Sequence, residues 1–132
     1  MKKILVAFLL SFMCVFSYAA DILKFQTTGL SIKTLENGSW TKWSDWEKCS
    51  CLVVINIDKD VITIYSSEKQ VYDIIECNDP YTDSDGDEVL KMHAVDQDGD
   101  ECDIRLISRL KGSDQLYVDF ADIMWVYNIE SK

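Results

Sequence analysis

The residues that most suggest chemistry are two copies of one acidic block. Asp-x-Asp-Gly-Asp-Glu occurs at residues 83–88 and again at 96–101. Calcium prefers carboxylate and carbonyl oxygens, so six aspartates are candidate ligands: Asp83, Asp85, Asp87, Asp96, Asp98 and Asp100. The spacing differs from an EF-hand, since with Gly86 at the loop's glycine position Met92 stands where the bidentate glutamate belongs. The block therefore favours turn formation over calcium binding, and the sequence indicates no other cofactor.

A second group that could bind a partner is a run of three tryptophans. Trp40, Trp43 and Trp46 recur every three residues in a short stretch between strand-like segments, which favours an irregular or extended passage. Exposed indole rings stack on sugars and anchor protein partners, so these three are the candidate partner-binding residues. The alternative is that they cover the core of the domain, and their exposure distinguishes the two.

Catalytic chemistry finds little support in the sequence. His93 is the only histidine, and no serine lies in a Gly-x-Ser-x-Gly nucleophile motif. Phosphate-binding glycine loops and histidine-rich metal motifs are also lacking. The carboxylates are many, but their spacing singles out no pair for the acid/base work of a glycosidase. We therefore expect a protein that is not an enzyme.

The cysteines predict one structural disulfide. Beyond the N-terminal segment they are Cys49, Cys51, Cys77 and Cys102, whereas a zinc site usually needs two Cys-x-x-Cys pairs. Counting the ends of a meander alternately puts Cys49, Cys51 and Cys102 at one end of the sheet and Cys77 at the other. Because a disulfide needs Cα atoms within about 7 Å, we expect one bridge, from Cys49 or Cys51 to Cys102.

The N-terminus predicts export. Lys2 and Lys3 precede an apolar run over residues 4–16, which is too short to be a convincing membrane helix. Small residues, Ser17 and Ala19, then stand at the recognition positions of a signal peptide. We expect cleavage after Ala19, no membrane span in the remaining chain, and a periplasmic or extracellular location in a bacterium, where disulfides persist.

The charge limits the partners that the protein can have. The formal net charge is −10, and because the predicted signal peptide carries two lysines and no acid, its removal makes the charge −12. Such a surface repels nucleic acid and anionic lipid and favours basic partners or divalent cations. The alternative is that the acidity only keeps an exported protein soluble.

The elements that must position these residues are strands. The clearest hairpin joins the β-branched segments 52–57 and 61–65. Each acidic block centres on Asp-Gly, a tight-turn dipeptide, so two further hairpins share the strand 89–95. No stretch shows convincing helical periodicity. We therefore predict a signal peptide over 1–19 and a single all-β domain over 20–132, an antiparallel meander of eight or nine short strands that forms a small closed or partly open barrel, with a two-sheet sandwich as the alternative.

The pattern along the chain also resembles a group of bacterial proteins. From Trp43 through the Ile/Val hairpin to Asp96-x-x-Gly99-x-x-Cys102 and Trp125-x-Tyr127, it is similar to the uncharacterised small secreted β-rich proteins that gut bacteria encode in number. The resemblance implies location and fold class and no activity.

These observations lead to two hypotheses of function. The first is an exported, non-enzymatic binding module toward a protein or glycan, one version being an inhibitor of a basic enzyme such as lysozyme. The alternative is a lipocalin-like carrier of a small apolar ligand, for which a domain of this length offers little interior space.

Overall fold

The protein is an antiparallel all-β barrel, as the strand pattern predicts. The computed structural model describes residues 22–132, so the predicted signal peptide lies outside the described residues. Residues 22–132 contain no helix, and hence none that could span a membrane. The strands are β1 (Ile22–Glu36), β2 (Ser39–Trp40), β3 (Glu47–Lys48), β4 (Leu52–Asn56), β5 (Val61–Tyr65), β6 (Lys69–Cys77), β7 (Tyr81–Thr82), β8 (Glu88–Val95), β9 (Glu101–Ser108), β10 (Asp114–Asp119) and β11 (Ile123–Ser131).

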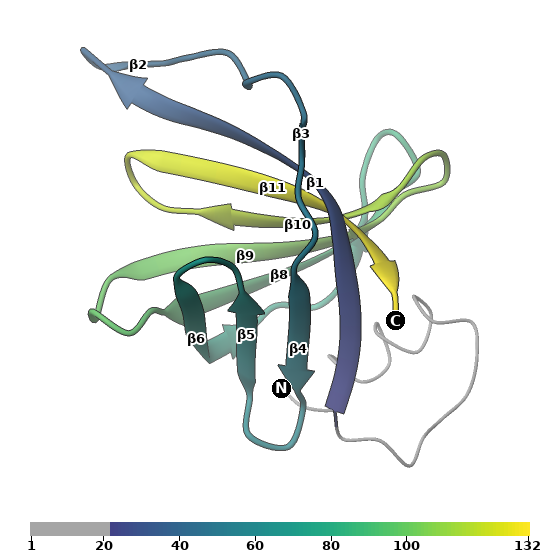
Figure 1. The fold of residues 1–132 in the computed structure, drawn as a ribbon. Helices are drawn as coiled ribbons and strands as arrows, with labels where there is room; N and C mark the ends of the chain where they lie inside the picture. The colour runs from purple at the N-terminus through teal and green to yellow at the C-terminus, as the bar shows by residue number, and fades with distance from the viewer. Residues whose placement is uncertain (1–21) are drawn as a thin grey trace.

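The first and last strands close the barrel. Eight strands follow one another around it in the order β1, β4, β5, β6, β8, β9, β10 and β11 (Figure 1). β1 is long enough, at 15 residues, to pair with β4 through Ile22–Gln26 and with β11 from Phe25↔Ser131 to Thr34↔Ile123. A β-bulge between Thr27 and Gly29 bends β1 between these pairings. The structure is thus the predicted closed barrel rather than a sandwich, and closure leaves the main sheet without a free edge.

Alternating side chains fill the interior of the barrel. In the hairpin of β4 and β5, Val53, Ile55, Ile62 and Ile64 are at most 1% exposed, while the residues between them are more accessible. This period of two is the pattern of strands with one buried face. The other strands of the barrel supply further buried side chains to the same core, among them Phe25, Tyr72, Leu90, Met92, Ile104, Leu106 and Leu116. A filled core of this kind stabilises a small domain by about 1.5–3 kcal/mol per buried large side chain.

A small polar network lies within this core. Gln70 donates from Nε2 to the Tyr127 hydroxyl at 3.0 Å and accepts a hydrogen bond from the Tyr72 hydroxyl at 2.5 Å. Both tyrosines are nearly inaccessible, and burial raises the pKa of Tyr127 to about 12 and that of Tyr72 further. The side-chain amide of Gln70 thus gives both tyrosine hydroxyls a hydrogen-bond partner, which buried polar groups require.

The two acidic blocks build the same turn twice. In the second copy the Asp96 carboxylate accepts hydrogen bonds from the amides of Asp98 and Asp100, both at 2.9 Å, and Gly99 adopts a φ of 85°. In the first copy Asp83 accepts in the same way from Asp85 and Asp87. The positive φ is the reason for glycine at this place in each turn. The first turn joins β7 to β8 and the second joins β8 to β9, so the two hairpins share β8 as predicted.

Candidate functional site: a tryptophan strap on the barrel wall

The three tryptophans lie on a segment that runs back along β1. This segment, residues 39–48, leaves β1 after a turn and returns beside it toward β4 (Figure 1); we call it the tryptophan strap. Its first end pairs through Leu35↔Trp40 and its last end through Gly29↔Lys48. Residues 41–46 between these ends are not a strand, since the strap pairs with β1 only at its two ends. The sequence prediction of an irregular or extended passage is confirmed.

Hydrogen bonds to β1 fix the irregular middle of the strap. The amides of Thr41 and Ser44 donate to the carbonyls of Thr34 and Ile32, each at 2.8 Å. The Ser44 hydroxyl in turn accepts from the Ile32 amide at 2.9 Å. Beneath them Ser31, which is 1% exposed, donates from its hydroxyl to the Ser44 carbonyl at 2.6 Å. The strap is therefore attached along its length, although it is not a regular strand.

Each indole is covered on one side and open on the other. Lys33 places Nζ 5.5 Å from the ring centre of Trp40 and 4.8 Å from that of Trp43, within the range of cation–π attraction. Trp43 also meets the ring of Tyr117 edge to face, with centroids 5.9 Å apart. Trp46 lies over Gly29, where an added Cβ would come within 3.3 Å of the indole atom Cε3.

The strap consequently forms an apolar patch on the outside of the domain. The exposed fractions are 37% for Trp40, 38% for Trp43 and 50% for Trp46, and neighbouring Leu35 is 38% exposed. We call these four residues the apolar patch. None of the three tryptophans is buried, so none belongs to the barrel interior. A group of large apolar side chains held together at a surface is a common mark of an interaction site.

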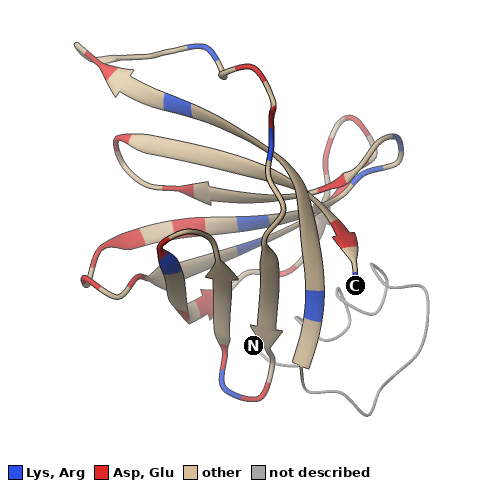
Figure 2. Ribbon diagram, viewed as in Figure 1, with Lys and Arg blue, Asp and Glu red and all other residues tan. Residues whose placement is uncertain are grey.

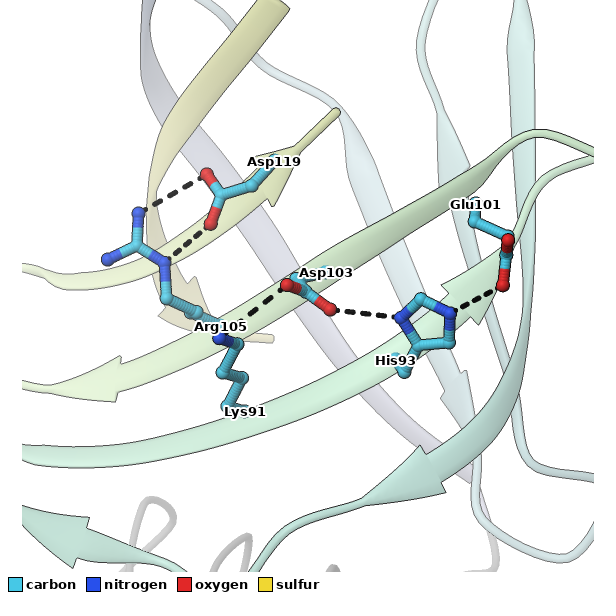
Figure 3. A network of polar contacts seen from close by, with 6 residues as sticks. All are labelled: Lys91, His93, Glu101, Asp103, Arg105 and Asp119. Carbon is cyan, nitrogen blue, oxygen red and sulfur yellow. Dashed lines mark hydrogen bonds and ion pairs between the residues drawn. The ribbon is translucent and has the colours of Figure 1, made fainter. Parts of the chain in front are cut away.

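A ladder of charged residues crosses the nearby strands β8, β9 and β10. Figure 3 shows six residues from three adjacent strands: Lys91, His93, Glu101, Asp103, Arg105 and Asp119. Arg105 donates from Nε to Asp119 at 2.6 Å and stacks over Tyr117 with its guanidinium carbon 4.1 Å from the ring centre. Because Tyr117 also contacts Trp43, the ladder and the strap meet at this tyrosine.

His93 is the centre of the ladder's other half. Its Nε2 lies 2.8 Å from a Glu101 oxygen and its Nδ1 lies 3.0 Å from an Asp103 oxygen. These two hydrogen bonds, Glu101's the stronger, raise the pKa of His93 above its usual value. Asp103 also pairs with Lys91 at 3.5 Å. Both ring nitrogens are thus engaged, and the group is an exposed ion cluster that links β8 to β9.

Sequence reasoning missed this cluster. His93 was the lone histidine in a predicted strand, and its partners are set by the register His93↔Asp103 across the hairpin. The Asp-Gly turn at 98–99 could have suggested that register, because a short hairpin fixes which residues face each other.

The acidic turns hold the carboxylates of their aspartates close together. In each block three carboxylates lie within 4.8 Å of one another: Asp83, Asp85 and Asp87 in the first, and Asp96, Asp98 and Asp100 in the second. The first aspartate of each block already accepts two backbone hydrogen bonds, and Asp87 accepts another from the Leu110 amide at 3.0 Å. These contacts show that the first aspartate of each block holds the backbone of its turn.

The predicted disulfide from Cys49 or Cys51 to Cys102 is not formed. All four cysteines of residues 22–132 are free thiols. Cys102 is 3% exposed in the core, where burial raises its pKa to about 12, whereas Cys49 and Cys51 follow the tryptophan strap and lie beside Thr27 of β1. Cys77, the fourth, is buried at the end of β6.

The stagger of the strands keeps Cys102 away from Cys49 and Cys51. Cys102 lies opposite Ala94, which lies opposite Ile74, and the Ile74 amide reaches the Asp60 carbonyl beyond the end of β4. Cys51 instead precedes the start of β4. Counting ends alternately gives the direction of each strand but not the shift between neighbours that closing a barrel imposes.

Comparison with known proteins adds no relative. No protein family, no curated protein and no solved structure matches the chain. The assignment of function therefore depends on the geometry of the tryptophan strap and its surroundings.

Proposed function

We propose that this protein is an exported, non-enzymatic binding module that recognises a basic protein through its tryptophan strap. The observation that carries the proposal is the exposure of three indoles, each 37–50% accessible, on a segment that hydrogen bonds attach to the barrel. If the three indoles served only the core, they would be buried in the free protein.

The strap is suited to binding because its aromatic anchors are held before a partner arrives. Tryptophan is enriched at the residues that dominate protein interfaces. Lys33 and Tyr117 restrict the indoles, so little conformational entropy is left to lose on binding. Aliphatic Leu35 beside Trp40 favours a protein surface over a sugar chain, whose polar hydroxyls it cannot satisfy.

The charge of the molecule favours a basic partner. The net charge is −10, and Figure 2 shows much of the acidic sequence in the turns that join the strands. Acids at the ends of the barrel would attract a basic protein over long range, and the apolar patch would make the short-range contact. An inhibitor of a basic enzyme such as lysozyme is the specific version of this proposal.

The alternative function, a lipocalin-like carrier, has no observation in its favour. Large side chains such as Phe25, Tyr72 and Met92 occupy the barrel interior and are at most 2% exposed. A carrier needs that volume for its ligand.

The experiment measures binding of the protein to lysozyme and the rate of lysozyme digestion of cell walls. We expect binding that weakens as salt is added, and a loss of affinity of about tenfold or more for each of W40A, W43A and W46A. Y81A is the matched control, because Tyr81 is 51% exposed on β7 away from the strap.

Two outcomes would contradict the proposal. Tryptophan variants that bind as tightly as Y81A would exclude the strap as the contact. Failure to bind lysozyme or any other basic protein tested, together with strap-dependent binding of soluble oligosaccharides, would replace the protein partner with a glycan.

A further inference from the structure

A pair of thiols lies where the tryptophan strap turns into β4. The Sγ atoms of Cys49 and Cys51 are 3.5 Å apart, and both side chains are partly buried against the core. A disulfide requires about 2.05 Å, so the sulfurs must approach by roughly 1.5 Å. Two residues apart along a chain, their Cα atoms are separated by at most about 7 Å, which reaches the range that disulfides span.

Thr27 holds the backbone of the pair in a bend. Its hydroxyl donates to the Cys49 carbonyl at 2.9 Å and accepts from the Cys51 amide at 2.7 Å, while its own amide donates to the Cys51 carbonyl at 2.9 Å. Thr27 is 1% exposed, so these bonds are shielded from water. One hydroxyl therefore joins both ends of Cys49-Ser50-Cys51 and turns both thiols to the same side.

We propose that Cys49 and Cys51 form a proximal dithiol that closes to an intramolecular disulfide by exchange with a small-molecule disulfide such as oxidised glutathione. This inference is independent of the proposed binding function, since it follows from the thiol geometry alone. It differs from the bridge to Cys102 that the sequence predicted, which the strand stagger prevents.

The exchange proceeds in two steps. One protein thiolate attacks a sulfur of oxidised glutathione, which forms a mixed disulfide and releases one glutathione thiolate. The second protein thiolate attacks the protein sulfur of that mixed disulfide, which forms the Cys49–Cys51 bond and releases the second glutathione thiolate. The two thiol protons of the protein end on the two glutathiones, so oxidised glutathione is reduced as the protein pair is oxidised.

The pair should form its disulfide faster in alkaline solution than at neutral pH. Burial, and then the hydrogen bond to Cys49, raise the pKa of Cys51 above its usual value. Exchange needs a thiolate, so the rate of closure should rise with pH. Closure would fix the bend that connects the strap to β4, because Cys49 follows the last residue of the strap directly.

The test incubates the reduced full-length protein with oxidised glutathione and then alkylates and digests it with trypsin. Residues 49–59 lie between two lysine cleavage sites and contain both thiols and no other cysteine. We expect this peptide to lose the mass of two hydrogen atoms and to carry neither glutathione nor alkyl groups. C49S and C51S should stop at the mixed disulfide.

Thr27 variants test the positioning. T27V removes both hydrogen bonds of the Thr27 hydroxyl while keeping nearly the same side-chain shape, so its Cys49–Cys51 disulfide should form about tenfold more slowly. In T27S the disulfide should form at nearly the wild-type rate. If T27V does not fold, the wild-type chain unfolded in urea is compared with the folded protein instead. The disulfide should form about tenfold more slowly in the unfolded chain.

Three results would overturn the proposal. They are a 49–59 peptide that accumulates glutathione on both cysteines, a peptide cross-linked to Cys102, and equal rates of closure in the folded and unfolded chains.

Discussion

Replacing Asp96 with alanine should destabilise the barrel by an amount that the turn geometry sets. The Asp96 carboxylate accepts two hydrogen bonds, each 2.9 Å long, from the amides of Asp98 and Asp100. A net contribution of about 0.5–1.5 kcal/mol per bond, at the lower end because the turn is exposed, gives a loss of about 1–2 kcal/mol. For a domain of this size we expect the Tm to fall by roughly 5–10 °C.

The assay is thermal and urea unfolding of D96A, followed by circular dichroism or tryptophan fluorescence. D96N is the informative companion, because its amide oxygen can still accept both bonds although the charge is gone, and it should recover most of the lost stability. D98A is the matched control, since Asp98 contributes its amide rather than its carboxylate to this turn. It should shift the Tm little.

The same substitution in the other copy provides an internal comparison. The Asp83 carboxylate accepts hydrogen bonds from the amides of Asp85 and Asp87 at 2.9 and 3.0 Å. D83A should therefore lower the free energy of unfolding as much as D96A does. If D96A and D98A unfold at the same temperature, or if D96N is as destabilising as D96A, the carboxylate does not hold the turn by these bonds.

Three further predictions follow from the core, the charged ladder and the strap. I104A should lower the free energy of unfolding in urea by about 2–5 kcal/mol, because Ile104 is fully buried. I75A, at a site that is 52% exposed, should lower it by under about 0.5 kcal/mol. Similar losses in the two variants would contradict the assignment of Ile104 to the interior. His93 has a raised pKa in the fold, so its stabilising effect is complete below its unfolded pKa of about 6.5 and is lost as the pH rises through the higher folded value. The difference in urea midpoint between wild type and H93Q should therefore shrink from pH 6 to pH 9, and a difference that grows would refute the ion cluster. K33M removes the cation above Trp40 and Trp43 and should increase quenching of tryptophan fluorescence by acrylamide, while K24M on the same strand should leave quenching unchanged.

Much of the fold could be predicted because its signals are local. The β-branched arms 52–57 and 61–65 form the β4–β5 hairpin, and each Asp-Gly block forms a turn that ends or begins β8. Alternation along a strand and the positive φ of a turn glycine depend on a few neighbouring residues. The meander therefore follows from the order of these segments in the chain.

The candidate site was only partly predictable. Trp40, Trp43 and Trp46 are a visible pattern, but whether an indole is covered depends on the strand it lies against, here β1 with Ser31, Lys33 and the small Gly29. The segment that contains Cys49 and Cys51 is held at both ends by Thr27, which is more than twenty residues away in the sequence.

The sequence by itself determined the strands, the two matching turns, the acidic charge and the absence of a recognisable catalytic motif, because each of these follows from residue type and short-range spacing. Only the tertiary structure decided that β1 pairs with β11, that Cys102 lies at the other end of β4 from Cys49 and Cys51, and that the tryptophans lie outside the core. The physical reason is the stagger between neighbouring strands. It arises when a twisted sheet closes on itself, so it is a property of all the strands together and of no single segment.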